Sequence, residues 1–130
     1  MQFEILSDPA NLKIVRKKVR EAIDKYDYKS DKIDEIILAV DEAVQNIIRY
    51  AYDMAKDKKI SFKILKDDKI LIFEIRDFGK QVPLEKIQSR NLDDVRPGGL
   101  GVHFIKSIAK DVKFEHQNEN LGGTKLILKF

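Results

Sequence analysis

The segment "KSDKIDEIILAVDEAVQNIIRYAYD" (residues 29–53) decides the fold, because a change of hydrophobic period follows it directly. Its apolar residues recur at helical spacing and predict one long amphipathic helix, with Ser30 as the capping residue. The chain then alternates between apolar and polar residues, so "KISFKIL" (59–65) and "KILIFEIRD" (69–77) predict two strands joined by a turn at "KDD" (66–68). A helix followed by a hairpin indicates an α+β protein. The predicted helical stripe consists of Ile33, Ile36, Ile37, Val40, Val44, Ile47 and Ala51.

The N-terminal residues add one strand and one helix. "QFEILS" (2–7) predicts a short strand, and the apolar spacing over residues 8–26 predicts a helix. Asp8 is the expected N-cap of this helix and Pro9 its first residue, because proline lacks an N–H group that would have no partner there. The predicted strand at 69–77 is apolar on both faces, so we expect it at the centre of the sheet.

The C-terminal part returns to both patterns after residues 78–99, which show weak periodicity and form a long predicted loop. "LGVHFIKSIAKD" (100–111) predicts a third helix, and "VKFEHQ" (112–117) and "GTKLILKF" (123–130) predict a closing hairpin. We therefore expect a single domain over residues 1–130. Its class is α+β, a two-layer α/β sandwich in which a mixed, mostly antiparallel sheet carries three helices on one face.

Composition narrows the classes of function. Of the 130 residues, 43% are hydrophobic and 36% are charged, and the net charge of +3 arises from interleaved lysines and acids rather than from a basic block. Direct nucleic-acid binding is therefore not expected. The lack of cysteine excludes disulfides and thiolate metal sites, and two histidines are too few for the usual multi-histidine zinc site. Without an apolar run near the roughly 18 residues of a membrane span, or a basic and apolar leader, we expect a soluble cytoplasmic protein with no membrane partner.

Glu42 and Asn46 form the first candidate site. They lie four residues apart in the predicted helix and therefore share a face, away from the centre of the apolar stripe. An asparagine oxygen suits Mg²⁺, which keeps several waters and takes substrate phosphates as ligands. A carboxylate one turn away can accept a proton or orient a water molecule. A solvated polar face is the alternative, and the pair alone does not decide between the two.

Asp77 and Gly79 form a second candidate site at the end of the apolar strand. The carboxylate can accept a hydrogen bond from a base such as adenine, and the glycine lets a flat ring approach the backbone. A simple strand-ending turn is the alternative.

Glycines mark a third candidate site. Gly98, Gly99 and Gly101 lie before and at the start of the third predicted helix, whose free N–H groups and positive dipole end suit phosphate. A flexible loop that ends in a helix is the alternative. Thr124 opens the last predicted strand, where an ordinary hairpin threonine explains it equally well.

These features occur in an order that resembles a known superfamily. "LAVDEAVQNIIRYAY" (38–52) and "GGLGVHFIKSIAKDVKFEH" (98–116) resemble the ATPases that include DNA gyrase, heat-shock-90 chaperones, histidine kinases and mismatch-repair proteins. Within this superfamily the chain is most similar to bacterial anti-sigma-factor serine/threonine kinases. The resemblance covers nearly all 130 residues, although residues before about Ile36 carry no motif. It implies an α/β sandwich of the Bergerat type, with the nucleotide under a mobile lid.

The resemblance also implies a role for each candidate residue. Glu42 would be the general base or water-orienting acid, and Asn46 would hold Mg²⁺. Asp77 would bind the adenine amino group, with Gly79 beside the ring and Thr124 closing that end of the pocket.

On the phosphate side, the resemblance implies a cradle at residues 98–101 and a contact from Arg96 to the γ-phosphate. The cradle consists of Gly98, Gly99, Leu100 and Gly101. A metal, a helix N-terminus and an arginine suit in-line phosphoryl transfer, which needs mainly positioning and charge neutralisation. ATP and Mg²⁺ are the implied cofactors.

The sequence departs from the superfamily pattern in two places. Many relatives have Asp-x-Gly-x-Gly, but Gln81 stands at the second glycine and inherits no role. Anti-sigma kinases often have histidine where Tyr50 stands, whereas a base followed by tyrosine, as in Arg49 and Tyr50, is typical of histidine kinases. Arg49 is therefore either a phosphate contact or a solvated helix arginine. We assign no role to His103.

The leading interpretation is an ATP-dependent serine/threonine protein kinase of the anti-sigma type. It would phosphorylate an anti-sigma antagonist protein, sequester a sigma factor and form a homodimer, as relatives commonly do. One alternative is a free-standing ATP-binding domain of the histidine-kinase type, which would need a separate partner with the phospho-accepting histidine. A second alternative is a non-catalytic, nucleotide-dependent protein-binding switch.

Overall fold

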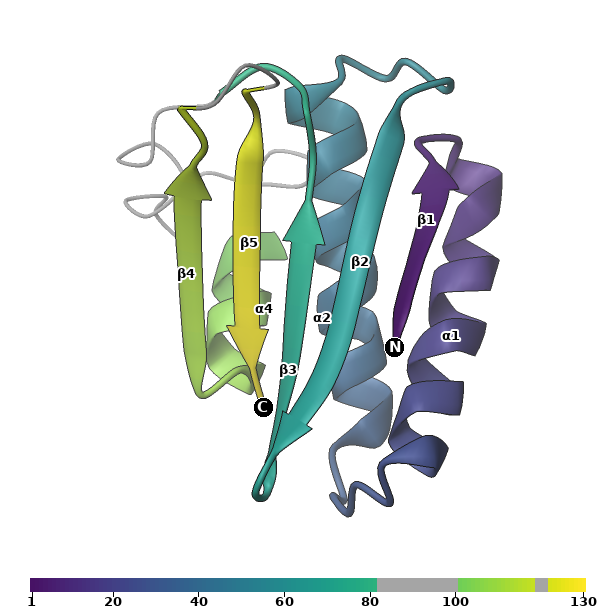
Figure 1. The fold of residues 1–130 in the computed structure, drawn as a ribbon, viewed down its shortest axis with the longest axis vertical. Helices are drawn as coiled ribbons and strands as arrows, with labels where there is room; N and C mark the ends of the chain where they lie inside the picture. Colours follow the sequence, from purple (N-terminus) through teal and green to yellow (C-terminus); the bar gives the residue numbers. More distant parts are fainter. Residues whose placement is uncertain (82–100, 119–121) are drawn as a thin grey trace.

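The computed structural model describes residues 1–81, 101–118 and 122–130. These residues form two layers, a five-stranded sheet and the helices that cover one of its faces (Figure 1). The strands are β1 (Gln2–Leu6), β2 (Lys59–Asp67), β3 (Ile70–Arg76), β4 (Asp111–His116) and β5 (Thr124–Lys129). The helices are α1 (Leu12–Lys25), α2 (Ile33–Asn46) and α4 (Gly101–Ile108), with a 3₁₀ turn η1 (Pro9–Asn11) before α1 and a π-helical turn η2 (Ile47–Ala51) after α2. The predicted α/β sandwich with helices on one face is confirmed.

The order of the strands brings two of the predicted site segments together. The sheet has the order β1-β2-β3-β5-β4, and all pairings among the described strands are antiparallel. β3 is central, as its two apolar faces predicted. At the end of β3, Arg76 lies opposite Lys125 near the start of β5. The residues after β3 therefore leave the sheet beside Thr124, the first residue of β5.

The core lies between the sheet and the helices. In β3, Leu71, Phe73 and Ile75 are fully buried, while the alternate residues of that strand are partly exposed. Burial alternates along β3 because successive side chains point to opposite faces of the sheet and helices cover only one of these faces. From the predicted helical stripe, the buried residues are Ile36, Ile37, Val40, Val44 and Ile47, and the partly exposed ones are Ile33 and Ala51.

Two local predictions were wrong. Ser30 is not the N-cap of α2, because the helix begins at Ile33 and the Ser30 hydroxyl instead accepts a hydrogen bond from the Lys32 N–H at 3.0 Å. The turn between β2 and β3 does not fall at residues 66–68, because β2 continues through Asp67 and pairs there with Ile70. The turn consists of residues 68–69, and Asp68 adopts a left-handed φ of +54° that short polar residues tolerate.

The predicted start of the first helical segment is confirmed. Asp8 accepts a hydrogen bond from the Ala10 N–H at 3.0 Å, and Pro9 is the first residue of η1, which leads into α1. The third predicted helix is α4, which begins at Gly101 and ends at Ile108. Within the described ranges, the helices are too short or too polar to cross a membrane.

Candidate functional site

Asp77 is a buried acid at the exit of β3, with 4% of its surface exposed. Its Oδ1 accepts a hydrogen bond from the Gly79 N–H at 3.0 Å, and its own N–H donates to the Thr124 carbonyl oxygen at 3.0 Å. Burial raises the pKa of the Asp77 carboxyl group, and backbone hydrogen bonds from Gly79 and Thr124 oppose that rise. Asp77, Gly79 and Thr124 therefore lie together, as expected, around a carboxyl group that would gain from one more donor.

Gly79 is required by the packing of the chain itself. A Cβ atom at this position would lie 2.4 Å from the Ala51 carbonyl oxygen and 2.7 Å from Cδ1 of Tyr52. The N–H of the next residue, Lys80, donates to the same Ala51 oxygen at 2.9 Å. The end of η2 thus packs directly against the segment that follows β3, which explains the glycine without any ligand. The position of Gly79 beside an adenine ring stays a prediction.

Gly123 is a residue of this corner that the sequence reasoning missed. Its φ is +81°, and a Cβ atom there would lie 2.1 Å from the Asp77 carbonyl oxygen. Gln81, which inherits no role, supports the same corner: its Nε2 donates to the carbonyl oxygens of Gln117 at 2.9 Å and Gly123 at 2.8 Å. The doublet of glycines before Thr124 was the available signal, but a hairpin turn explains such a doublet equally well from sequence alone.

On α2, two neighbouring acids have different environments. Asp41 is 6% exposed and accepts hydrogen bonds from Arg16 Nη1 at 3.2 Å and Gln45 Nε2 at 2.9 Å, so it ties α2 to α1. Glu42 is half-buried and forms no ion pair or side-chain hydrogen bond with the described residues. Asp41 therefore has a structural function, and Glu42 is the acid available for chemistry.

Asn46 lies one turn after Glu42 and is half-buried. Its Oδ1 is buried and has no hydrogen-bond partner in the part of the chain that the structure describes. Buried side-chain oxygens are bonded in the large majority of cases, so this atom needs an explanation. Within the same part of the chain, no cluster of His, Cys, Asp or Glu could hold a metal by itself. A metal at Asn46 would need phosphate and water oxygens as further ligands, which fits Mg²⁺.

The helix α4 packs against α2 and begins at Gly101. The predicted phosphate cradle would use N–H groups of the first turn of α4, because the first N–H groups of a helix have no partner within the helix, and this contact stays a prediction. Val102 and Ile105 are buried on its inner side, and His103 Nε2 is buried without a hydrogen-bond partner among the described residues.

The other predicted phosphate contacts are not tested by the structure. Arg49 lies half-buried in η2, with its guanidinium carbon 5.9 Å from the ring centre of Tyr50. Its contact to a phosphate stays a prediction. The remaining predicted contacts, Arg96, Gly98, Gly99 and Leu100, lie outside the described residues.

Comparisons with known proteins agree with this arrangement. The chain matches the histidine kinase-like ATPase domain over residues 5–130. A serine-protein kinase RsbW from Staphylococcus aureus is 34% identical over 114 residues, which cover 76% of this chain and 69% of the relative. An anti-sigma F factor from Clostridium acetobutylicum is 27% identical over 135 aligned residues, with 99% and 91% covered. A crystal structure of the RsbU and RsbW domains of a Mycobacterium tuberculosis protein matches with a TM-score of 0.63 at 18% identity, over 99% of this chain but only 32% of that longer one.

The chain therefore belongs to the histidine kinase-like ATPase family, a class of proteins that implies ATP as the ligand. Within that family its relatives include proteins named serine-protein kinase RsbW and anti-sigma F factor.

Proposed function

We propose that this chain, as a single domain over residues 1–130, is an ATP-dependent serine/threonine protein kinase of the anti-sigma type. It transfers the γ-phosphoryl group of ATP to a hydroxyl group of an anti-sigma antagonist protein. The observation that carries the proposal is the buried Oδ1 of Asn46, one turn from the carboxylate of Glu42, since neither group has a partner among residues 1–81, 101–118 and 122–130. Both lie on the helix whose continuation, η2, packs against the segment that holds Asp77.

At the base end of the proposed site, Asp77 accepts a hydrogen bond from the exocyclic amino group of adenine. A carboxylate has about four lone-pair positions, so the bond from the Gly79 N–H leaves acceptor capacity for the base. Thr124 closes this end from β5. The burial of Asp77 strengthens the bond, since a buried carboxylate has few water molecules to lose.

At the phosphate end, Asn46 Oδ1 holds Mg²⁺, which when bound neutralises the charge of the β- and γ-phosphates. Glu42 accepts the proton of the attacking hydroxyl group. Arg49, Arg96 and the N–H groups of residues 98–101 contact the phosphate oxygens. No nucleophile is needed in this chain, because the acceptor hydroxyl belongs to the partner protein.

The proposed partners follow from the names of the relatives. The chain binds an anti-sigma antagonist as phosphoryl acceptor and a sigma factor as the protein that it sequesters, so phosphorylation controls transcription by exchange of partners. Because these partners act in the cytoplasm, the proposal includes a cytoplasmic location. It also includes a homodimer, which analytical ultracentrifugation of the purified chain would detect.

Calorimetric titration with ATP, with and without Mg²⁺, tests the nucleotide site first. We expect micromolar affinity that requires Mg²⁺. No heat and no thermal shift at millimolar ATP would overturn the proposal, and the chain would then be a protein-binding switch without nucleotide.

The variant Glu42→Ala tests catalysis. We expect it to bind ATP nearly as well as the unchanged chain and to transfer phosphate to the antagonist about 100- to 10,000-fold more slowly. Glu35→Ala is the matched control, since Glu35 is an exposed acid on the same helix. Acid treatment of the product identifies the acceptor: phosphoserine survives, whereas phosphohistidine is lost and would favour the histidine-kinase type of activity.

A further inference from the structure

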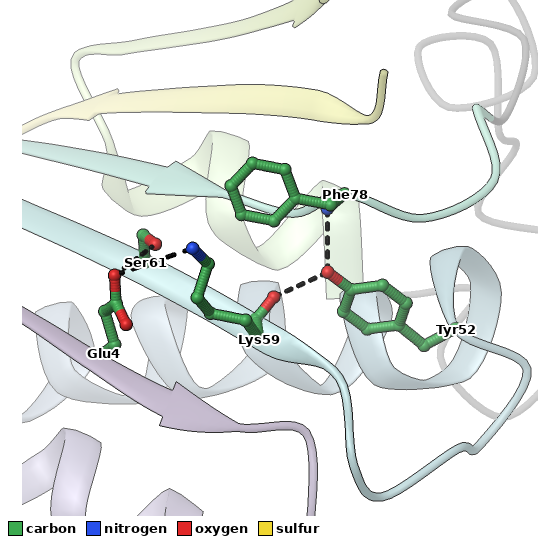
Figure 2. Close-up of polar contacts among 5 residues, drawn as sticks. All are labelled: Glu4, Tyr52, Lys59, Ser61 and Phe78. Carbon is green, nitrogen blue, oxygen red and sulfur yellow. Dashed lines mark hydrogen bonds and ion pairs between the residues drawn. The ribbon is translucent and has the colours of Figure 1, made fainter. Parts of the chain in front are cut away.

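The hydroxyl group of Tyr52 joins strand β2 to the segment that follows β3 at the proposed base site (Figure 2). Tyr52 follows η2 and is 8% exposed. Its Oη accepts a hydrogen bond from the Phe78 N–H at 2.7 Å and donates one to the Lys59 carbonyl oxygen at 2.5 Å. One buried oxygen thus connects the first residue of β2 to the residue after Asp77, and its burial raises the pKa of the phenol.

The ring of Tyr52 supports the same segment from a second direction. A side chain at Gly79 would meet Cδ1 of this ring, so ring and glycine are in close contact. Tyr52 therefore touches the two residues that follow Asp77. The hydroxyl bonds the backbone of the first, Phe78, and the ring packs on the second.

The side chain of Phe78 has weaker and more exposed support. Its ring lies 4.8 Å from Lys59 Nζ and 4.7 Å from the guanidinium carbon of Arg76. Lys59 in turn lies 3.8 Å from Glu4, a pair with side chains 49% and 60% exposed (Figure 2). Exposed ion pairs of this kind contribute little to stability. The buried Tyr52 hydroxyl is therefore the principal support for the backbone between Asp77 and Gly79 on the β2 side.

We infer that Tyr52 is a positioning residue for the base end of the site: its hydroxyl holds the Phe78 backbone so that the Asp77 carboxylate stays directed at the nucleotide base. The inference rests on the proposed function. On the β5 side, Asp77 is held by its bond to Thr124, and the Tyr52 hydroxyl supplies the opposing bond from β2 through Lys59. With both bonds present, the carboxylate is placed before the nucleotide arrives, and preorganisation of this kind favours binding.

Tyr52→Phe removes the hydroxyl and keeps the ring, and Tyr26→Phe is its matched control. The Tyr26 hydroxyl also forms two hydrogen bonds. It accepts one from the Met1 amino group at 2.8 Å and donates one to the Ile64 carbonyl oxygen at 3.1 Å. We expect both variants to fold with similarly lowered unfolding temperatures. Only Tyr52→Phe should raise the KM for ATP, by about five- to tenfold, with kcat changed by less than about twofold. Tyr26→Phe should leave both constants unchanged.

A second measurement does not depend on ATP. Carboxyl NMR of the free protein reports the pKa of Asp77, which burial raises. If Tyr52 holds this segment, Tyr52→Phe admits water and lowers the Asp77 pKa toward its ordinary value, whereas Tyr26→Phe does not. A residue that contributed only to stability would change neither the Asp77 pKa nor the KM.

The outcomes separate this inference from the proposed function. Failure of the unchanged chain to bind ATP would overturn the proposed function, and the Asp77 pKa in the two variants would still decide whether Tyr52 positions the carboxylate. If the unchanged chain binds ATP but Tyr52→Phe behaves like Tyr26→Phe in both KM and Asp77 pKa, the inference is wrong and the proposed function stands.

Discussion

The two ends of the proposed site differ in how completely the protein satisfies its own polar groups. At the base end, the carboxylate and the N–H of Asp77 are bonded, and so is the N–H of Phe78. At the phosphate end, Asn46 Oδ1 is buried without a partner and Glu42 is unpaired within the described part of the chain. The polar groups of the base end therefore bond to the protein itself, whereas the phosphate end has bonding capacity that the described residues leave unused and a ligand could use.

This difference separates two kinds of mutational effect. Where packing and hydrogen bonds already hold a residue, a substitution changes stability as well as binding. Where a buried polar atom lacks a hydrogen-bond partner, its removal should change the stability of the folded protein little. The effect of the substitution should then appear only when the ligand binds. Three predictions test this contrast, in order of decreasing expected effect.

The largest effect is expected at Gly123. In Gly123→Ala, the new Cβ would lie 2.1 Å from the Asp77 carbonyl oxygen, and the left-handed φ of +81° would be strained. We expect the free energy of unfolding to fall by about 2 to 4 kcal/mol in urea denaturation. Gly122→Ala is the control, since Gly122 has a similar φ of +62° but nothing within 4 Å of the added atom. It should lose only about 1 kcal/mol. Equal losses in the two variants would mean that the close approach to Asp77 is absent.

The second prediction separates the charge of Asp77 from its packing. Asp77→Asn keeps an oxygen for the Gly79 N–H but replaces the other acceptor by a donor, which opposes the amino group of adenine. We expect ATP affinity to fall about 10- to 100-fold in calorimetry. Unchanged ATP affinity would mean that Asp77 does not bind the base.

The stability of Asp77→Asn should depend on pH in a defined direction. Because the folded-state pKa of Asp77 is raised, the folded chain binds this proton more tightly than the unfolded chain, whose carboxyl pKa is about 3.9. The contribution of Asp77 to stability is thus fully present below the unfolded-state value and is lost as pH rises through the folded-state value. Asparagine does not titrate, so the variant should gain stability relative to the unchanged chain from acid to neutral pH. Thermal unfolding of both chains at several pH values measures this difference, and a variant that loses stability relative to the unchanged chain from acid to neutral pH would contradict the prediction.

The smallest effect on the folded protein is expected at Asn46. Asn46→Ala removes a buried oxygen that has no partner among the described residues, so the unfolding temperature should change little, whereas Mg²⁺-dependent ATP affinity should fall about tenfold. Gln45→Ala is the matched control, because the neighbouring amide donates to Asp41 at 2.9 Å and has no proposed ligand. It should lose stability and keep its affinity. If Asn46→Ala instead lost stability and kept its affinity, while Gln45→Ala lost affinity and kept its stability, the proposed difference between the two ends of the site would be wrong.

Much of the fold could be predicted from local pattern. The alternation of apolar and polar residues predicted the strands, and helical spacing predicted the apolar stripe of α2. The two apolar faces of β3 predicted its position at the centre of the sheet. The boundaries were less predictable. Ser30 had the right composition for a cap, but α2 begins only at Ile33. Residues 66–68 had the right composition for a turn, but pairing with β3 extends β2 through Asp67. For the site, the resemblance to the ATPase superfamily grouped Asp77, Gly79 and Thr124, and the structure brings these three together.

The sequence by itself determined the two layers and the candidate residues, because burial of one face imposes a period that can be read along the chain. Only the tertiary structure showed how Asp41 and Glu42 differ, since the packing of α1 against α2 gives Arg16 to the first, whereas the second has no side-chain partner in the part of the chain that the structure describes. The close contact of Gly123 with Asp77 and the bonds of the Tyr52 hydroxyl were likewise decided by tertiary structure. Each of these contacts joins residues that are far apart in sequence, so the local hydrophobic periodicity cannot predict it.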